Sequence, residues 1–276
     1  MDDARRDLEL DAIAAFYRQA LAFADDARAL IRDALRRGVT VKQKPDGSFV
    51  TDADLRVEER LRARIRAAFP DHGILGEEFP AHNPEAPFQW ILDPIDGTED
   101  FVHRVPTFGS IIALYYRDRP LIGVLDHPAL DMRASAGFGL GTYYNDARVQ
   151  LTDPAPASDS ARLVLSARAN FVRYRDAGDH FDRLVRVYPN HRIYRSCFGQ
   201  TLVAIGKADA MVDYHDRPWD LAAVPVLVTE AGGTYRLLHE FDAEGAPVRS
   251  VVFGRARMVD DIAAVLDNKT LNAKGS

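Results

Sequence analysis

Two stretches in the first quarter of the chain repeat apolar residues every three or four positions, which is the spacing of an amphipathic helix. The first stretch ends near Arg37, before the helix-stop residue Gly38. The second begins at Thr51, ends before Pro70 and has an apolar stripe of Val57, Leu61, Ile65 and Phe69. Pro45-Asp46-Gly47 marks a loop between them. We therefore expect two helices that cover a sheet.

Shorter apolar runs then follow, and they predict strands. The runs are Ile74-Leu75, Trp90 to Leu92, Ser110 to Tyr116 and Leu121 to Asp126. The last two meet around Asp118-Arg119-Pro120, which predicts a hairpin. The glycines of Gly137 to Gly141 resemble a phosphate loop only weakly, because no helix pattern follows them. We interpret them as a turn between another pair of strands.

The composition changes at Thr152 to Ser158, where proline, alanine and serine dominate. This change predicts an α+β half over residues 1–152, with long helices, an antiparallel sheet and most candidate ligands, and an α/β half over residues 153–276. The expected strands beyond it are Arg162 to Ser166 and Ala210 to Val212, and the expected helices are Ala177 to Val187, Gln200 to Ile205 and Asp220 to Glu230. Pro225 should kink the last helix.

Composition and charge narrow the class of protein. Of 276 residues, 47% are hydrophobic, which suffices for a sizeable core. The 35 basic and 41 acidic residues give a net charge of -6, which does not favour nucleic-acid binding. Cys197 is the only cysteine, so no internal disulfide forms, and a reducing compartment is expected. The N-terminus lacks the apolar core of a signal peptide, and no apolar run reaches the roughly 20 residues of a membrane span. We expect a cytoplasmic protein that does not enter a membrane.

The segment Asp93 to Thr98 combines two carboxylates with turn residues. An apolar run stops at Asp93, which predicts that this residue lies at a strand end. A turn at this spacing can bring Asp93, Asp96 and the Ile95 carbonyl oxygen to one point. A helix that begins near Gly97 would direct free N–H groups to the same point, which suits phosphate. Oxygen ligands without sulfur or imidazole favour magnesium over zinc. Asp-Pro and Asp-Gly are ordinary turn dipeptides, however, so either fragment taken alone is better explained as part of an acidic turn that caps a helix.

Other acidic residues follow comparable signals. Glu77 and Glu78 follow a short apolar run, and Asp220 begins an otherwise apolar helix. Asp52 and Asp54 stand at the start of the second helix. Surface acids and helix caps explain each of these residues when it is taken alone.

Together, these segments resemble the inositol monophosphatase family of metal-dependent phosphatases. The matching segments are Thr51 to Asp54, Gly76 to Glu78, Asp93 to Thr98, Trp219-Asp220 and Glu230 to Gly233. They extend over nearly the whole chain. The resemblance implies the layered αβαβα sandwich of the inositol monophosphatase and sugar phosphatase type, an α+β / α/β fold. It also implies a phosphoric monoester hydrolase.

The resemblance further implies a set of metal ligands for two or three Mg²⁺ ions. Glu77, Asp93 and the Ile95 carbonyl would hold the first ion. Asp93, Asp96 and Asp220 would hold the second, and a third, weaker ion would rest on Glu77. Two such ions can neutralise the phosphate and activate water together.

Catalytic roles are carried over in the same way. Thr98, with its hydroxyl polarised by Asp54, would orient and help to deprotonate the attacking water, and Glu77 completes the catalytic set. The N–H groups of Gly97 and Thr98 would bind the phosphate. The resemblance implies direct in-line displacement without a covalent intermediate, and inhibition by lithium.

The alcohol part of the substrate is less defined. In the family, an acidic residue shortly before Trp-Asp binds the substrate's hydroxyls; here it is Asp213, although a solvated loop acid is an equal interpretation. Phe101 to Pro106 resembles the inositol-type enzymes, whereas Phe69 to Glu78 and Arg217 to Trp219 resemble the histidinol-phosphate branch. We expect myo-inositol monophosphate, with histidinol phosphate as the alternative. Lys44 either approaches the outer metal or phosphate, or is a solvated loop lysine.

A regulatory binding protein on the same fold is an alternative of another class, because bacterial relatives join the transcription machinery. Every metal ligand that the family uses is nevertheless present in this chain. The partner expected is thus a small phosphate monoester rather than nucleic acid or membrane. The family also implies a homodimer.

Overall fold

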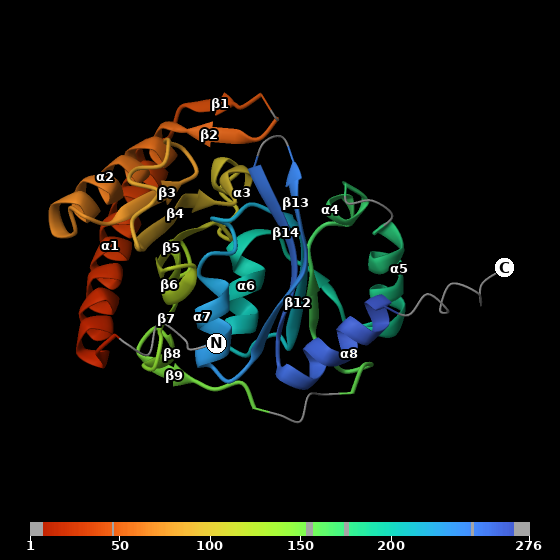
Figure 1. Ribbon diagram of the computed structural model, residues 1–276. Coiled ribbons are helices and arrows are strands. Elements are labelled where there is room, and N and C mark those ends of the chain that lie inside the picture. The colour runs from red at the N-terminus through yellow and green to blue at the C-terminus, as the bar shows by residue number, and fades with distance from the viewer. Residues whose placement is uncertain (1–7, 46, 153–156, 174–176, 244–245, 268–276) are drawn as a thin grey trace.

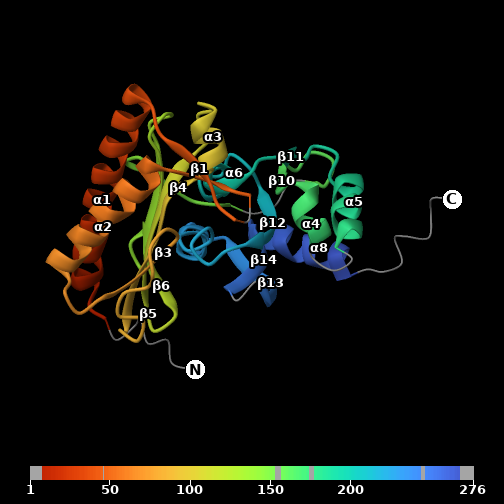
Figure 2. The ribbon, with the colours of Figure 1, turned by 90° about the horizontal axis from the view of Figure 1, so that it is seen from above.

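Five layers of helices and sheets stack on one another in the computed structural model, which describes residues 8–45, 47–152, 157–173, 177–243 and 246–267. The helical layers are α1 (Leu10–Arg37) with α2 (Asp52–Ala68), then α6 (Ser196–Ala204) with α7 (Val224–Glu230), and finally α4 (Arg168–Arg173), α5 (Gly178–Val187) and α8 (Ala256–Asp267). A sheet separates each pair of helical layers (Figures 1 and 2). The expected αβαβα sandwich is confirmed.

The first sheet has seven strands in chain order. They are β3 (Gly73–Gly76), β4 (Phe88–Asp96), β5 (Gly109–Tyr116), β6 (Arg119–His127), β7 (Met132–Gly137), β8 (Gly141–Tyr144) and β9 (Ala147–Val149). β3 is parallel to β4, and all later pairs are antiparallel. The hairpin between β5 and β6 is confirmed, with Arg117 and Asp118 at positive φ in a two-residue turn. The turn of Gly137 to Gly141 between β7 and β8 is confirmed as well.

Helices α1 and α2 cover the outer face of this sheet, as their periodicity predicts. Phe23 of α1 packs edge-on against Trp90 of β4, with ring centroids 5.3 Å apart. The apolar stripe of α2 is fully buried at Val57, Leu61 and Ile65. Burial of these side chains fixes both helices against the sheet whose strand β4 carries Asp93 and Asp96.

The second sheet has five strands in the order β11-β10-β12-β14-β13. They are β10 (Leu163–Leu165), β11 (Arg192–Ile193), β12 (Ala210–Asp216), β13 (Thr234–Ala243) and β14 (Ala246–Gly254). β10 and β12 confirm the two expected strands, and α5 confirms the expected helix. The β13–β14 hairpin and α8 are additional to the sequence prediction. Alternate residues of β12 face opposite layers, since Met211 contacts the middle helices and Val212 the outer ones.

The middle layer lies between the two sheets and corrects two predictions. α7 begins at Val224 rather than Asp220, and Pro225 stands in its first turn, where the missing N–H breaks no helical hydrogen bond. The predicted kink is therefore wrong. α6 begins at Ser196, earlier than the predicted Gln200. Gly123 of β6 permits the close packing of α7, because a Cβ there would lie 2.6 Å from the Ala223 carbonyl oxygen.

Two smaller elements stand near the upper end of the first sheet in Figure 1. These are the hairpin of β1 (Val41–Gln43) and β2 (Phe49–Thr51), and the short helix α3 (Thr98–Val102). The expected loop at residues 45–47 lies in the chain between these two strands, and its residue 46 is outside the described residues. Residues 153–156 also lie outside them, so the division into halves at residue 152 stays a prediction.

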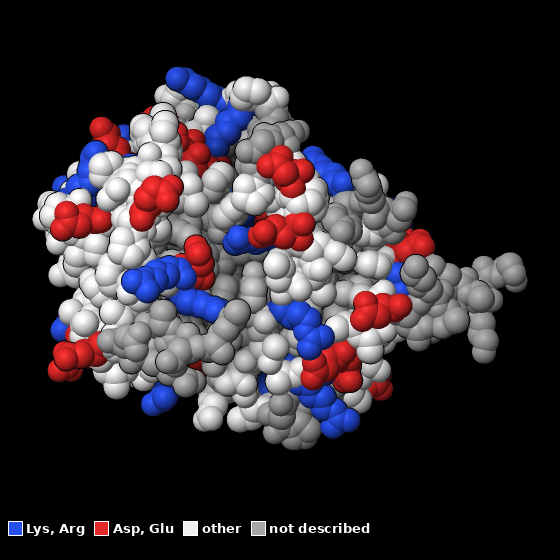
Figure 3. All heavy atoms as spheres, viewed as in Figure 1, with Lys and Arg blue, Asp and Glu red and all other residues white. Residues whose placement is uncertain are grey.

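Helix hydrophobicity and surface charge bear on whether membranes or nucleic acids are partners of this protein. No helix in the described part of the chain has the length and apolar character needed to cross a membrane. Acidic and basic side chains alternate over the face seen in Figure 3. Among the described residues, this face therefore presents no uniform basic area.

Candidate active site

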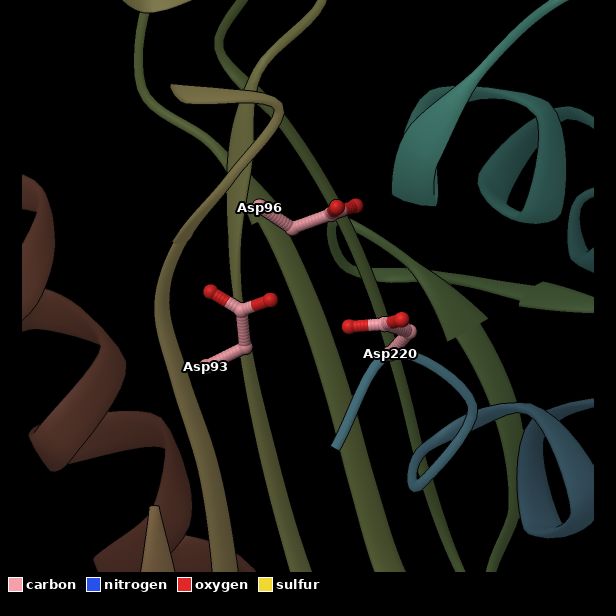
Figure 4. Close-up of side chains that lie close together, drawn as sticks. All are labelled: Asp93, Asp96 and Asp220. Atoms are coloured by element: carbon pink, nitrogen blue, oxygen red, sulfur yellow. The ribbon is translucent and has the colours of Figure 1, made fainter. Parts of the chain in front are cut away.

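Three carboxylates from two distant parts of the chain meet between the first sheet and the middle helices. Asp93 and Asp96 come from β4, and Asp220 from the turn before α7 (Figure 4). One oxygen atom of each lies within 4.8 Å of the others. Asp93 is only 1% exposed. Its Oδ1 atom has no hydrogen-bond partner among the described residues.

A break in strand pairing places the first two carboxylates. β4 pairs with β5 up to Asp93, and pairing resumes only at Asp96. The intervening residues bulge, so that both acids reach the same end of the strand. The prediction that the strand stops at Asp93 is wrong in detail, because β4 continues to Asp96. Gly97 follows at φ +82°, a backbone conformation that favours glycine, and α3 then begins at Thr98.

Asp220 is held by its own turn and by α6. Its Oδ2 atom accepts a hydrogen bond of 2.7 Å from the Arg217 N–H, and its carbonyl oxygen accepts one of 3.1 Å from Gln200 Nε2. Asp96 is fixed similarly, because its Oδ2 atom accepts the N–H of Cys197 in the first turn of α6. The middle layer thus orients two of the three carboxylates.

The electrostatics of these carboxylates indicate a cation site. Burial raises the pKa of Asp93 well above its ordinary value, and the charges of Glu77, Asp96 and Asp220 raise it further. Burial also raises the pKa of Asp96, to about 6, against the lowering effect of Cys197. Negative charges buried so closely repel one another unless a cation neutralises them. The all-oxygen donors and the unpartnered Asp93 Oδ1 fit a hard divalent cation such as Mg²⁺.

Glu77 lies beside this group and is paired with a lysine. Lys44 Nζ is 2.7 Å from Glu77 Oε1 and 2.8 Å from Glu78 Oε1. Burial lowers the pKa of Lys44, but the two glutamates outweigh it and leave the pKa raised. Lys44 is thus an ion-paired residue of the site and not a freely solvated lysine.

Thr98 and Asp54 meet as the sequence predicts. Thr98 Oγ1 lies 3.3 Å from Asp54 Oδ1 and 3.0 Å from the Ile95 carbonyl oxygen. The other oxygen of Asp54 accepts the N–H and hydroxyl of Thr51, which caps α2. Burial raises the pKa of Asp54 to about 6. Hydrogen bonds therefore orient the carboxylate at both of its oxygens.

A cavity of about 840 Å³ opens beside these groups. Its lining includes Glu77, Asp96, Thr98, Ser166, Gln200, Asp213, Asp216 and Asp220. Asp213 is 3% exposed, so the interpretation of it as a solvated acid is wrong. A shift in pairing between β12 and β14 separates Asp213 from Asp216 and turns the end of β12 into the cavity wall.

Sequence reasoning missed two residues of this wall. Asp216 lies three residues after Asp213, and burial together with the Asp213 charge raises its pKa well above the ordinary value. Gln200 is 1% exposed in α6. A lone glutamine among the apolar residues of a helix was the available signal, because such a side chain is buried only when it is hydrogen-bonded.

These features define a class of protein. A layered αβαβα sandwich with clustered carboxylates and a hydroxyl–carboxylate pair, all beside one cavity, is the arrangement of a metal-dependent phosphatase. The chain belongs to the inositol monophosphatase family, whose sequence profile matches residues 13–269. It is accordingly a phosphoric monoester hydrolase.

Individual relatives agree with this assignment. The histidinol-phosphatase of Chlorobaculum parvum is 39% identical over 215 residues, which cover 78% of this chain and 82% of the relative. That of Mycobacterium tuberculosis is 37% identical over 221 residues, with 78% and 84% covered. The solved structure of an inositol monophosphatase from Zymomonas mobilis aligns with a TM-score of 0.78 at 28% identity, covering 97% of this chain and 100% of that one.

Proposed function

We propose that this chain hydrolyses a small phosphate monoester with Mg²⁺ and a directly attacking water. The observation that carries the proposal is the meeting of Asp93, Asp96 and Asp220 within 4.8 Å. When bound, Mg²⁺ would neutralise phosphate charge and lower the pKa of a coordinated water. Glu77, Asp93 and the Ile95 carbonyl would hold one ion, and the three aspartates the second. A third ion would rest on Glu77.

The chain's own groups orient the reactants. Thr98 Oγ1 would position the attacking water, and Asp54 would accept the proton that Thr98 passes on; their separation of 3.3 Å supports this. The N–H groups of Gly97 and Thr98 would bind phosphate oxygens, because they precede or lie in the first turn of α3, where N–H groups lack helical partners.

A direct test changes one ligand from each part of the chain. Asp93→Asn and Asp220→Asn should each lower Mg²⁺-dependent phosphate release at least 1000-fold, on the order expected for loss of a metal's charge stabilisation. Circular dichroism should show an unchanged fold. Wild-type rates in either variant, or in excess chelator, would contradict the proposal.

For the alcohol, we propose an amino alcohol such as histidinol, ahead of myo-inositol. Asp216 Oδ2 and Gln200 Oε1 are buried without a hydrogen-bond partner among the described residues. Gln200 Nε2 donates to the Asp220 carbonyl oxygen, and Asp213 hydrogen-bonds both Gln200 and Asp216.

This wall of acceptors supports a cationic substrate. An ammonium group supplies three donors and a positive charge, which suits Asp213, Asp216 and Gln200 together. A neutral hydroxyl supplies one donor and no charge. The 39% and 37% identity to histidinol-phosphatases supports the same choice. From the sequence we expected myo-inositol monophosphate ahead of histidinol phosphate as the substrate, and the present proposal reverses that order.

The test compares two substrates in two variants. Wild type should have at least tenfold higher kcat/KM for histidinol phosphate than for inositol-1-phosphate. Asp216→Asn should lower kcat/KM for histidinol phosphate about tenfold or more, the usual effect of losing a charged hydrogen bond, and change the inositol value less than twofold. Glu99→Gln is the matched control, because Glu99 lines the same cavity but is exposed and pairs with Arg195 at 3.4 Å. A preference for inositol-1-phosphate would contradict the assignment.

Three family properties stay predictions for this chain. They are inhibition by lithium, assembly as a homodimer and a cytoplasmic location. Lithium should inhibit phosphate release competitively with Mg²⁺, and light scattering should give twice the mass of the 30.7 kDa chain.

A further inference from the structure

A buried polar stripe runs along α2 beside its apolar stripe. Asp54, Glu58 and Arg62 follow one another at intervals of four residues and so lie on one face of the helix. Asp54 and Glu58 are 0% exposed, and Arg62 is 7% exposed. Buried charges are destabilising unless they are paired and hydrogen-bonded. The hydrogen-bond partners of Glu58 and Arg62 therefore indicate the role of these two buried charges.

Glu58 binds the backbone that follows β3. Its Oε2 atom accepts the Glu78 N–H at 2.8 Å, and its Oε1 atom accepts the Phe79 N–H at 3.2 Å. The same Oε1 atom accepts Arg62 Nε at 2.7 Å. A Cβ on Gly76 would lie only 2.2 Å from Oε1, so the carboxylate rests directly against the last residue of β3.

Arg62 binds the same segment from the next helical turn. Its NH2 nitrogen donates to the Phe79 carbonyl oxygen at 2.8 Å, and its NH1 nitrogen donates to the Pro80 carbonyl oxygen at 3.0 Å. Residues 77–80 belong to no strand or helix. Four hydrogen bonds from the Glu58–Arg62 pair thus take the place of regular backbone pairing over residues 78–80.

This clamp lies directly beside Glu77. Gly76 belongs to β3 on one side of Glu77, and the clamped Glu78 follows on the other. One turn before Glu58, the same helix carries Asp54, which contacts Thr98. Helix α2 therefore carries both the residue that contacts the water-orienting threonine and the pair that holds the backbone immediately after Glu77.

We propose that Glu58 and Arg62 are positioning residues, which set the place of Glu77 relative to the Asp54–Thr98 pair and thereby the strength of metal binding. The inference rests on the ligand role of Glu77 in the proposed function. A flexible 77–80 segment would let the Glu77 carboxylate sample many positions, and the entropy of ordering it would weaken cation affinity.

The test measures cation binding without substrate. Mn²⁺, a hard cation that accepts the same oxygen ligands, is titrated into the whole protein, and free Mn²⁺ is counted by electron paramagnetic resonance. Glu58→Gln has the same size but turns an amide nitrogen toward N–H donors, so it should weaken Mn²⁺ binding about tenfold. The Mg²⁺ concentration for half-maximal activity should rise equally, with kcat at saturating Mg²⁺ changed less than threefold.

Asp209→Asn is the matched control. Asp209 is likewise buried, at 2% exposure, and pairs with Arg255 at 3.0 Å. It lies just before the first residue of β12, whereas the cavity is at the other end of that strand. Its loss should lower stability without changing Mn²⁺ binding. Equal weakening in Asp209→Asn and Glu58→Gln would overturn the inference, since general destabilisation would then explain both.

Two further variants separate the possible failures. Arg62→Lys keeps the ion pair but cannot reach both carbonyl oxygens, so it should fold and still weaken Mn²⁺ binding severalfold. Normal binding in Glu58→Gln and Arg62→Lys, together with weakened binding in Glu77→Gln, would overturn the inference alone. Normal binding in Glu77→Gln would overturn the proposed ligand set and the inference with it.

Discussion

At the scale of single residues, Asp54 is a carboxylate whose ionised form is destabilised by burial. One oxygen is committed to Thr51 at the start of α2, and the other faces the Thr98 hydroxyl. Burial raises the pKa of Asp54 to about 6; hydrogen bonds from Thr51 lower it, and the charges of Glu78 and Glu77 raise it. Ionised Asp54 is therefore destabilising in the protein without bound cations.

This gives a prediction for pH and stability. Between the ordinary aspartate pKa of about 3.9 and the folded value of about 6, the folded protein holds a proton that the unfolded chain has released. The free energy of unfolding therefore falls as pH rises through this window. We compare wild type with Asp54→Asn by urea unfolding in excess chelator. Between pH 4.5 and pH 7, the free energy of unfolding of wild type should fall by about 2 kcal/mol more than that of Asp54→Asn. Equal losses would contradict the raised pKa.

At the scale of elements, α7 illustrates how position changes the effect of a residue. Pro225 lies in the first turn, where its fixed φ suits the helix and its missing N–H breaks no bond. Because α7 begins at Val224, the preceding residues form the turn that presents Asp220. If the helix began at Asp220 instead, the residues from Asp220 to Ala223 would be helical and would not form this turn.

Pro225→Ala tests this placement. In the first turn, the substitution should lower the free energy of unfolding by about 1 kcal/mol or less, because alanine leaves the unfolded chain more freedom. In a helix interior, removal of a kinking proline would instead stabilise by about 3 kcal/mol. Thermal unfolding of the two proteins in the presence of Mg²⁺ distinguishes the two cases.

At the scale of the whole molecule, the site lies where the layers meet. β4 of the first sheet supplies Asp93 and Asp96, and the turn before the middle helix α7 supplies Asp220 (Figure 4). Asp213 comes from β12 of the second sheet. The mutually repelling carboxylates of the cation site thus join the first sheet to the middle layer. Cation binding should stabilise the packing of these two layers.

The expected effect can be measured in wild type and Asp93→Asn. Mg²⁺ at about 100 times its dissociation constant should raise the free energy of unfolding of wild type by about 2.7 kcal/mol. Asp93→Asn should be more stable than wild type in chelator at pH 7.5, because one repelling charge is gone, and should gain less than about 1 kcal/mol from Mg²⁺. A wild-type protein indifferent to Mg²⁺ would contradict a cation site among the carboxylates.

Much of the fold was predictable because its signals are local. The periodicity of α1 and α2, the hairpin predicted around Asp118-Arg119-Pro120 and the glycines before β8 depend on a few residues of chain, and all were confirmed, with the hairpin turn at Arg117-Asp118. The β13–β14 hairpin was not predicted. β13 is an edge strand whose pattern mixes exposed and half-buried positions, so its alternation carries little signal.

For the site, the sequence by itself determined the candidates for the chemistry, because turn residues, spacing and family motifs pointed to Asp54, Asp93, Thr98 and Asp220. Only the tertiary structure decided the burial and partners of these groups. It alone identified Asp216 and Gln200 as cavity wall and the Glu58–Arg62 pair as the support of Glu77. The reason is physical: the partner of a buried charge lies in a distant segment, and no local pattern records it.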